Sequence, residues 1–421
     1  MASRLIALPV QKGDSFLLEQ GERTLLVDGG EERCFVNLLS KYWKKSEKIV
    51  DVVVCTHNDK DHSDGIIQLL SSLTYKIHEL RVPAIWDVIE TNLGSSVSED
   101  TKQAYVQELL LDVLYLTQQT ISPDYDLKRL VNDVLRRRYR KSSNYRYWIE
   151  DLRRLVGRGA KVFVDALVAH VSDEEFLNGN LTVSLLNAKN QAWNPEINLD
   201  FFGLGQPRAQ KLTLQILGCV NRILAIMALV AYRRQRGEYL RIRYYRHRPA
   251  RAITPKVGEF LLPVNAAEVP TWFFRKNAAG AKSAMNHPLG HLALTITNRN
   301  SLAFYAIETG SESGVLFSGE CCIDPKQCQP KKPIVATAPH HGADDNRVVY
   351  PRVNVWAPSG VVWVRSDWKC PCRPCFAYVR LNAVKYCTIC NTITSQKQAV
   401  ELEDMGLGWK SVGKVQRCTC H

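Results

Sequence analysis

The sequence has no hydrophobic run long enough to cross a membrane. Its longest apolar stretch, residues 212–232, is interrupted by Asn221 and Arg222. The uninterrupted part, residues 223–231, is much shorter than the roughly 20 residues that a spanning helix needs. The first ten residues contain a single arginine and no long apolar core, so they do not resemble a secretory signal. We therefore expect a cytoplasmic protein with no membrane span, in which residues 212–232 form a buried helix.

Internal repeats and long low-complexity segments are also missing, and the composition is that of a globular protein. A chain of 421 residues, 45% of them hydrophobic, can bury a sizeable core and is long enough for two or three domains. Lysine and arginine outnumber aspartate and glutamate by 55 to 42, which gives a formal net charge of +13. This excess favours polyanionic partners such as nucleic acid or an acidic membrane surface.

Short strand patterns alternate with turns at the start of the chain and resume after a long helical region. Residues 5–8, 15–19 and 24–28 predict strands, residues 35–44 a helix, and residues 49–55 a strand buried on both faces. Residues 101–118 and 123–140 predict long, charged helices. Further strands are predicted at residues 239–245, 259–265, 293–297, 302–307, 315–318 and 334–338. The pattern is that of an α/β protein.

The strongest chemical signal directly follows the buried strand, in the run Thr56-His57-Asn58-Asp59-Lys60-Asp61-His62. A hydrolytic metal site needs imidazoles and carboxylates that converge on one point and leave a coordination position for water. His57, Asp59, Asp61 and His62 supply four such groups within six residues. The alternative interpretation is a polar surface loop. We favour a metal site.

The spacing H-x-D-x-D-H followed by Gly65 resembles the signature loop of the metallo-β-lactamase superfamily. Five further segments look like ordered motifs of its competence DNA-uptake (ComEC-like) branch: residues 11–18, 24–30, 298–302, 315–320 and 339–342. The resemblance covers residues 5–84 and 239–365. It implies a four-layer αββα sandwich with a metal site at one edge of the facing sheets. The domains would be two halves of that fold, 1–94 and 239–365, a helical insertion, 95–238, and a cysteine-rich tail, 366–421.

The resemblance also implies roles for individual residues. His57 and Asp59 would hold one metal position, and Asp61 and His62 a second, where both would act in catalysis and Asp61 would orient the attacking water. Glu320 would bridge the two positions, and His340 or His341 would complete the second. One or two divalent metals, zinc or manganese, are therefore expected.

Two positions depart from the family pattern. Glu320 stands where the family usually has aspartate, so its carboxylate would reach about one bond further into the site. Asn298 stands near the place of a histidine in many members, so one metal position could lose a ligand, and His287 or His291 could replace it.

Seven of the 13 cysteines lie between Cys370 and Cys420, which in a reducing compartment points to metal binding. The pairs Cys372-x2-Cys375 and Cys387-x2-Cys390 have spacing close to that of a four-cysteine zinc ribbon. We expect a structural zinc at these four cysteines, with further candidate ligands at Cys370, Cys418, Cys420 and His421. Such a site would stabilise a small module or serve as a docking surface for nucleic acid or protein, and it would have no catalytic role.

A basic and aromatic segment precedes the second set of strands. It carries seven candidate nucleic-acid-binding residues: Arg233, Arg234, Arg236, Arg241, Arg243, Arg246 and Arg248. Arginines that bind phosphates, interleaved with tyrosines that stack on bases, are common in nucleic-acid clefts. The alternative is a solvated helix face and a charged strand edge.

These features predict a metal-dependent hydrolase, a phosphodiesterase or nuclease in which a metal-bound hydroxide attacks DNA or RNA. One alternative is hydrolysis of a small ester, a lactone or a nucleotide messenger, because the same fold hosts all of these. Another is a non-catalytic subunit that binds nucleic acid, or a protein, through the helical insertion or the zinc tail. A role in defence against foreign nucleic acid would suit the first hypothesis.

Overall fold

The computed structural model describes residues 3–87, 207–247, 259–269, 301–307, 313–325 and 329–420, with short gaps at 369, 371–372, 391, 394–395, 407, 414 and 416. The predicted helices at 101–118 and 123–140 and the predicted strand at 293–297 lie outside these residues. The chain divides into two compact units. The first comprises Met1–Ala84, Arg233–Phe273 and Asn298–His421, and the second comprises Ile85–Tyr232 and Phe274–Thr297.

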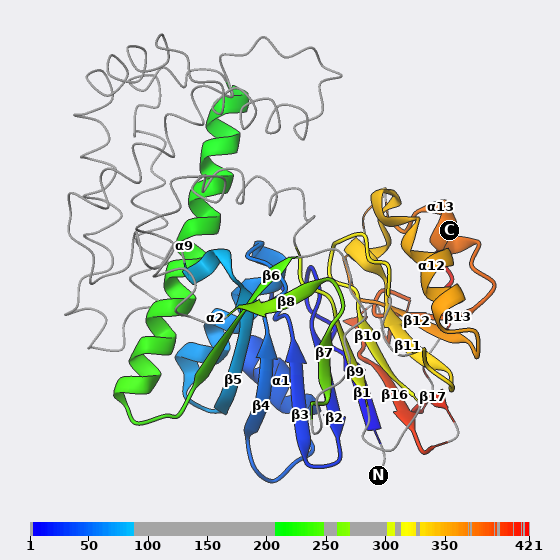
Figure 1. Cartoon of the computed structure of the whole chain (residues 1–421), viewed down its shortest axis with the longest axis horizontal. Coiled ribbons are helices and arrows are strands. Elements are labelled where there is room, and N and C mark those ends of the chain that lie inside the picture. The colour runs from blue at the N-terminus through cyan, green and yellow to red at the C-terminus, as the bar shows by residue number, and fades with distance from the viewer. Residues whose placement is uncertain are drawn as a thin grey trace. The chain divides into compact units, whose positions relative to one another are not determined.

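The first unit is a mixed α/β structure with two large sheets (Figure 1). The larger sheet has nine strands in the order β17-β16-β1-β2-β3-β4-β5-β6-β8. They are β1 (Ser3–Ala7), β2 (Phe16–Gln20), β3 (Arg23–Val27), β4 (Ile49–Val54), β5 (Lys76–Pro83), β6 (Arg241–His247), β8 (Ala266–Val269), β16 (Val400–Asp404) and β17 (Trp409–Ser411). Strands β3 to β6 are parallel and the other pairings are antiparallel.

The smaller sheet has six strands in the order β13-β12-β11-β10-β9-β7. They are β7 (Leu261–Pro263), β9 (Phe304–Ile307), β10 (Gly314–Phe317), β11 (Ile334–Thr337), β12 (Val361–Arg365) and β13 (Val384–Cys387). Strands β10 to β13 are parallel. A separate hairpin pairs β14 (Thr392–Ile393) with β15 (Gln396–Lys397). Most expected strands are therefore present, with ends shifted by one or two residues.

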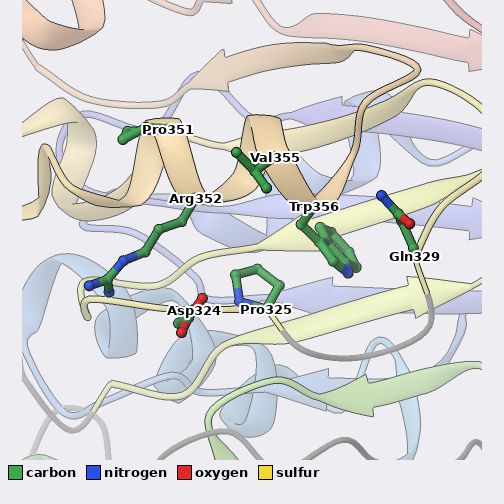
Figure 2. A pocket seen from close by; sticks show the side chains of 7 residues that line it. All are labelled: Asp324, Pro325, Gln329, Pro351, Arg352, Val355 and Trp356. Carbon is green, nitrogen blue, oxygen red and sulfur yellow. The ribbon is translucent and has the colours of Figure 1, made fainter.

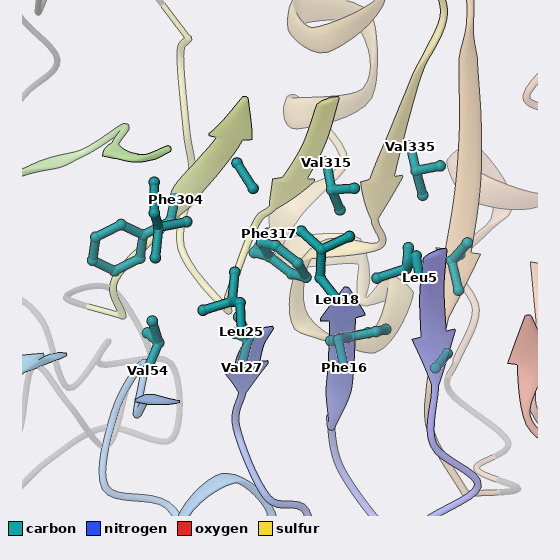
Figure 3. Close-up of a cluster of buried hydrophobic side chains, with 14 of the residues drawn as sticks. Leu5, Phe16, Leu18, Leu25, Val27, Val54, Phe304, Val315, Phe317 and Val335 are labelled. Atoms are coloured by element: carbon teal, nitrogen blue, oxygen red, sulfur yellow. The ribbon is translucent and has the colours of Figure 1, made fainter. Parts of the chain in front are cut away.

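Alternate residues of the two sheets meet in one hydrophobic core (Figure 3). In β2, Phe16 and Leu18 point into this core, while Leu17 between them is buried on the opposite face, as the two-residue period of a strand requires. The smaller sheet contributes Phe304 and Phe317, and the ring centroids of Phe16 and Phe317 lie 6.0 Å apart. The two sheets thus pack face to face, with large side chains of both in contact between them.

A second core covers the outer face of the smaller sheet. Helix α12 (Val349–Trp356) and the short helix α13 (Phe376–Val379) contribute buried side chains to it. Tyr350 of α12 lies edge-on to Trp363 of β12, with 5.0 Å between ring centroids. Short 3-10 turns, η2 (Pro339–Gly342) and η3 (Asp344–Asn346), connect β11 to α12.

Helices α1 (Phe35–Tyr42) and α2 (Lys60–Ser72) contact each other and lie along the larger sheet (Figure 1). Helix α2 begins directly after the expected metal-binding loop. A side chain at Gly65 would place its Cβ 2.2 Å from the carbonyl oxygen of Gly29, so only glycine permits this approach of α2 to the loop after β3. Backbone contact therefore holds the first turns of α2 against the loop that follows β3.

The cysteine-rich tail is not a separate module, because its strands complete both sheets. Strand β13 pairs with β12 at one edge of the smaller sheet, and β16 pairs with β1 in the larger one. Leu402 of β16 is fully buried in the core between the sheets. The expected boundary at residue 366 is therefore not a structural boundary.

Within the expected insertion, the structure describes one long helix, α9 (Pro207–Gln235). It covers the predicted buried helix, and Ile223, Ile226 and Val230 are at most 1% exposed. Among the described helices, none combines the length and apolar character that crossing a bilayer requires.

Candidate metal centre

The expected metal-binding residues come from loops at the carboxyl ends of parallel strands. His57 and Asp59 follow β4, and Asp61 and His62 lie in the first turn of α2. Glu320 follows β10 and His341 follows β11, so the second half of the chain delivers its ligands from the facing sheet.

One group of possible ligands consists of His57, Asp59 and Glu320. Nε2 of His57 lies 3.3 Å from Oε2 of Glu320 and 3.7 Å from Oδ2 of Asp59. These are separations of atoms that could share one ion.

A second group consists of Asp61, His62, Glu320 and His341. Oε1 of Glu320 lies 3.0 Å from Nε2 of His62 and 2.9 Å from Nε2 of His341, which in turn lies 3.7 Å from Oδ2 of Asp61. Glu320 therefore presents one carboxylate oxygen to each group. The centre can hold one or two metal ions, with Glu320 between the two positions.

Several of these atoms are buried without a suitable partner. His57 Nε2, Glu320 Oε2 and His341 Nε2 are inaccessible to solvent, and none makes a well-aligned hydrogen bond to a described residue. Buried polar atoms are normally satisfied, because an unpaired one costs about 1–3 kcal/mol. His57 Nε2 and Glu320 Oε2 lie in the first group and His341 Nε2 in the second, so a metal ion in each group would satisfy them.

The other nitrogen of each imidazole is held by an oxygen, which leaves Nε2 for the metal. His62 Nδ1 lies 2.8 Å from Oδ2 of Asp28. Thr56 donates its hydroxyl to the same Asp28 oxygen at 2.7 Å and lies 3.0 Å from His57 Nδ1. Because the Thr56 proton is used on Asp28, its oxygen accepts the Nδ1 proton of His57. Asp28 thus selects the tautomer of two candidate ligands.

His341 has an equivalent arrangement. Its Nδ1 lies 3.1 Å from Oδ1 of Asp14 and 3.2 Å from the carbonyl oxygen of Ser366. The backbone amide of Asp14 donates to the carbonyl of Asp61, so the loop before β2 contacts the first turn of α2. Asp14 and Asp28 are not among the predicted site residues, although both lie in segments that resemble family motifs. An acidic residue beside a strand end was the only signal.

Opposite charges dominate the electrostatics of the centre. Burial alone would raise the pKa of Glu320, but the charges of His57 and His62 outweigh it and hold that pKa well below its usual range. Burial would likewise lower the pKa of His62, but Asp28 and Glu320 raise it well above the ordinary value. The nearby carboxylates therefore favour a protonated imidazole at His62, and a metal ion would take the place of that proton.

Solvent reaches the centre from one side. The side chains of His57, His62 and His341 are fully buried and Glu320 is 3% exposed, whereas Asp59 and Asp61 are each 29% exposed. A substrate would approach past the two aspartates.

The loop that carries His341 has an unusual backbone. His340 and His341 both have positive φ, 49° and 52°, which costs a residue with a side chain about 1–2 kcal/mol. The turn brings His341 into the second group, while His340 is 25% exposed and its Nε2 lies 3.9 Å from Glu320. His341, not His340, is the candidate ligand of the described centre.

The glutamate at position 320 suits this geometry. Ser301 accepts the backbone N–H of Glu320 at 2.8 Å, and Asn346 donates to its carbonyl at 3.1 Å. With the backbone held in this way, the longer side chain reaches all three imidazoles. The other departures, Asn298 with His287 and His291, lie outside the described residues.

A second cluster brings together the Sγ atoms of Cys387, Cys390, Cys418 and Cys420. The expected set is corrected here: Cys387 and Cys390 meet the last two cysteines of the chain and not Cys375. Cys375 is buried in the hydrophobic core beside α12 instead. Cys370 is not part of the cluster, and Cys372 and His421 lie outside the described residues.

Several of the candidate nucleic-acid-binding arginines are used inside the fold. Arg233 is fully buried and donates to the carbonyls of Leu69, Leu70 and Tyr75 and to Glu238, at 2.6 to 3.1 Å. A guanidinium used in this way holds the chain together and cannot contact phosphate.

The other arginines that were predicted to bind nucleic acid differ in their surroundings. Arg243 pairs with Glu79, Glu259 and Glu268, which raises its pKa further although burial would lower it. Arg234 donates to the carbonyl of Leu240. Arg236 and Arg241 are exposed, Arg246 is partly exposed, and Arg248 lies outside the described residues.

The exposed Arg241 lies at the amino end of β6, away from the carboxyl ends of the strands that carry the metal centre. It opposes Glu79 of β5, which opposes Val52 of β4. Five residues of nearly extended chain, or roughly 16 Å, separate Val52 from His57. Arg241 is therefore remote from the carboxyl ends of the strands, where the candidate ligands lie.

A surface pocket of about 440 Å³ lies beside α12, on the outer side of the smaller sheet (Figure 2). Arg352, Val355 and Trp356 of α12 face Asp324 and Pro325 across it. None of the described residues that line it is a candidate metal ligand, so this pocket is separate from the metal centre.

No protein-family model matches the chain, and a search among curated proteins finds no match. The function is therefore inferred from the geometry of the site.

Proposed function

We propose that this chain is a metal-dependent hydrolase that cleaves phosphodiester bonds, with one or two divalent ions at the centre around Glu320. The observation that carries the proposal is the position of Glu320, whose two oxygens each face a different group of possible ligands. A carboxylate between two metal positions is typical of centres that clamp the attacking and leaving oxygens of a displacement at phosphorus.

We also infer the fold that the resemblance implies, a four-layer αββα sandwich of the metallo-β-lactamase type. Three observations support it: the two sheets share a core, α12 and α13 cover one outer face, and α1 and α2 lie along the other sheet. The candidate ligands at the strand ends support it as well.

The net charge of +13 favours a polyanion as substrate, and DNA or RNA is the polyanion that we propose. The arginines of residues 233–248 contribute less to this inference than expected, because the two most buried are used inside the fold.

When bound, divalent ions would supply Lewis acidity and positive charge at the scissile phosphate. The chain itself contributes orientation. Asp28 and Asp14 fix the imidazoles of His62 and His341. Burial would raise the pKa of Asp61, but the nearby imidazoles of His341 and His62 lower it. Asp61 is therefore ionised and partly open to solvent, and it can accept a hydrogen bond from an attacking water.

The test is hydrolysis by metal-stripped protein to which manganese or zinc is returned. The substrates are single-stranded DNA, double-stranded DNA, RNA and a small chromogenic phosphodiester. Glu320→Gln should lower the rate at least about a hundredfold, because it weakens both metal positions. His78→Ala is the matched control: His78 is 53% exposed and pairs with Asp51 away from the centre.

Cleavage of the small diester but not of nucleic acid would redirect the proposal to a nucleotide messenger. Metal binding without hydrolysis of any phosphodiester would overturn it and favour an ester or lactone substrate or a binding subunit.

A further inference from the structure

The four-cysteine cluster has the dimensions of a tetrahedral thiolate site. Zinc bonds of about 2.3 Å place two sulfurs of a tetrahedron about 3.8 Å apart. The Sγ atoms of Cys387 and Cys420 are 3.7 Å apart, those of Cys390 and Cys420 are 3.3 Å apart, and all four lie within 4.8 Å of one another.

Two parts of the chain build this cluster. Cys387 ends β13 and Cys390 follows in the next turn. The C-terminal segment returns along β13, where the amide of Cys418 donates to the carbonyl of Lys385 at 2.8 Å. The amides of Cys390 and Thr419 point at the sulfurs of Cys387 and Cys390, at 3.2 and 3.3 Å. Amides that donate to sulfur stabilise thiolates, the form that binds metal.

Arg365 connects this cluster to the metal centre. The side chain is 1% exposed and lies at the end of β12. Its Nη1 lies 3.3 Å from Sγ of Cys420, and its Nε donates to the carbonyl of His341 at 2.7 Å. Asp367, fully buried, accepts its Nη2 at 3.0 Å and so holds the guanidinium between the two. One planar group thus contacts a cysteine of one site and the backbone of a candidate ligand of the other.

The connection matters because the His341 turn needs support. Both histidines of the turn have left-handed backbone, and a Cβ at Gly342 would lie 3.5 Å from Cδ of Arg365. The hydrogen bond from Arg365 fixes the carbonyl of a residue whose Nε2 is 2.9 Å from Glu320. A shift of the guanidinium would therefore move a ligand of the metal centre.

We propose that one zinc ion binds to Cys387, Cys390, Cys418 and Cys420. We further propose that this zinc site fixes the guanidinium of Arg365 through Cys420, and that Arg365 in turn positions His341 in the metal centre. The zinc has no open coordination position, so it acts on structure and not on substrate. Arg365 is a positioning residue. The second part of the proposal rests on the proposed metal centre but not on its hydrolytic activity.

The experiment uses the full chain, in which cobalt replaces the native metals. Cobalt bound to thiolates gives intense charge-transfer absorption, whereas cobalt bound to imidazole and carboxylate gives weak bands, so the two sites are read separately. We expect Cys418→Ser to abolish the thiolate bands and to weaken cobalt binding at the His341 site by about 10–100-fold, the usual effect of losing a supporting partner. Cys418→His, which can still bind zinc, should restore both. Cys34→Ser, at an exposed cysteine outside the cluster, is the control.

Arg365→Lys tests the connection itself, since lysine keeps the charge but has no planar fork to reach both partners. It should keep the thiolate bands and weaken only the second site. Circular dichroism and one thiolate-bound cobalt per chain would show that this variant is folded. Protein without thiolate bands, or with the cysteines in disulfides, would overturn the zinc site. Unchanged cobalt affinity at the His341 site in both variants would overturn the role of Arg365.

Discussion

The substitution Asp28→Asn isolates the effect of one carboxylate that touches no metal. Asp28 accepts three hydrogen bonds: Oδ1 takes the amide of Thr56 at 2.8 Å, and Oδ2 takes the Thr56 hydroxyl at 2.7 Å and faces His62 Nδ1 at 2.8 Å. Its φ is 58°, a conformation that asparagine tolerates well. The exchange therefore keeps the shape and the backbone and changes only the pattern of donors and acceptors.

Asparagine can satisfy only part of this pattern. If its oxygen accepts the Thr56 amide, its NH₂ group faces the Thr56 hydroxyl and His62 Nδ1, which were both donors. The imidazole of His62 can avoid the conflict by moving its proton to Nε2, the atom that faces Glu320. That proton blocks the metal. Losing such a partner costs about 10–100-fold in metal affinity, or about 1.4–2.7 kcal/mol.

The assay is competition for manganese or zinc between the protein and a chelating dye. Asp51→Asn is the matched control, because Asp51 also accepts a backbone amide, from Thr24 at 2.7 Å, and also pairs with a histidine, His78, but lies away from the centre. It should bind metal as the parent does. If Asp28→Asn and the parent have equal affinities, the assignment of the imidazole tautomers is wrong.

Three further outcomes follow from contacts of the same unit. Arg233→Met should lower the free energy of unfolding by about 3–5 kcal/mol, because buried carbonyls and Glu238 lose their donor, and urea titration followed by circular dichroism checks this. Leu402→Ala should cost about 2–5 kcal/mol in the main unfolding transition, and a separate minor transition would show that the tail folds alone after all. Burial alone would lower the pKa values of His62 and His341, but the nearby carboxylates raise them well above the usual value. Metal binding near pH 7 should therefore release about two protons, and the metal affinity should increase as the pH rises. Calorimetry in buffers with different heats of ionisation measures this release, and a value near zero would contradict it.

Local pattern was enough to predict most strands of the fold. Residues 24–28 and 49–55 were predicted as strands, and the structure has β3 at Arg23–Val27 and β4 at Ile49–Val54. Their hydrophobic period depends only on which faces are buried, and sequence carries that information. The pairing of β16 with β1, which brings Ser3 opposite Asp404, is not encoded in any local pattern.

The candidate site also contains residues that local sequence predicts and residues that only the fold brings together. His57, Asp59, Asp61 and His62 lie within six residues, so their spacing alone indicated a metal site. The choice between His340 and His341 could not be made, because it depends on a left-handed turn that no residue type in the segment requires. The partners of His62 and His341 could not be predicted either, since Asp28 and Asp14 reach them only through the fold.

The arginine segment shows why counting charges does not locate a binding surface. Seven residues lie between Arg233 and Arg241, yet the first is fully buried and the second is exposed. Arg233 donates to the carbonyl groups of Leu69 and Leu70 at the end of α2, and these hydrogen bonds hold its side chain inside the fold. An arginine whose guanidinium donates to buried carbonyl groups contributes to folding and cannot bind a partner. Only the exposed charges are available for binding.

The cysteine-rich tail contacts two segments beside the metal centre. Lys397, between β13 and β16, donates to the carbonyls of Val10, Gln11 and Asp367 at 2.6 to 3.0 Å. It therefore joins the loop that carries Asp14 to the segment beside Arg365. Because β16 lies between β1 and β17, a chain that stops before residue 400 would leave β1 as an unpaired edge with a hydrophobic face. Residues 400–420 thus contribute both to the larger sheet and, through Cys420 and Arg365, to the proposed support of His341.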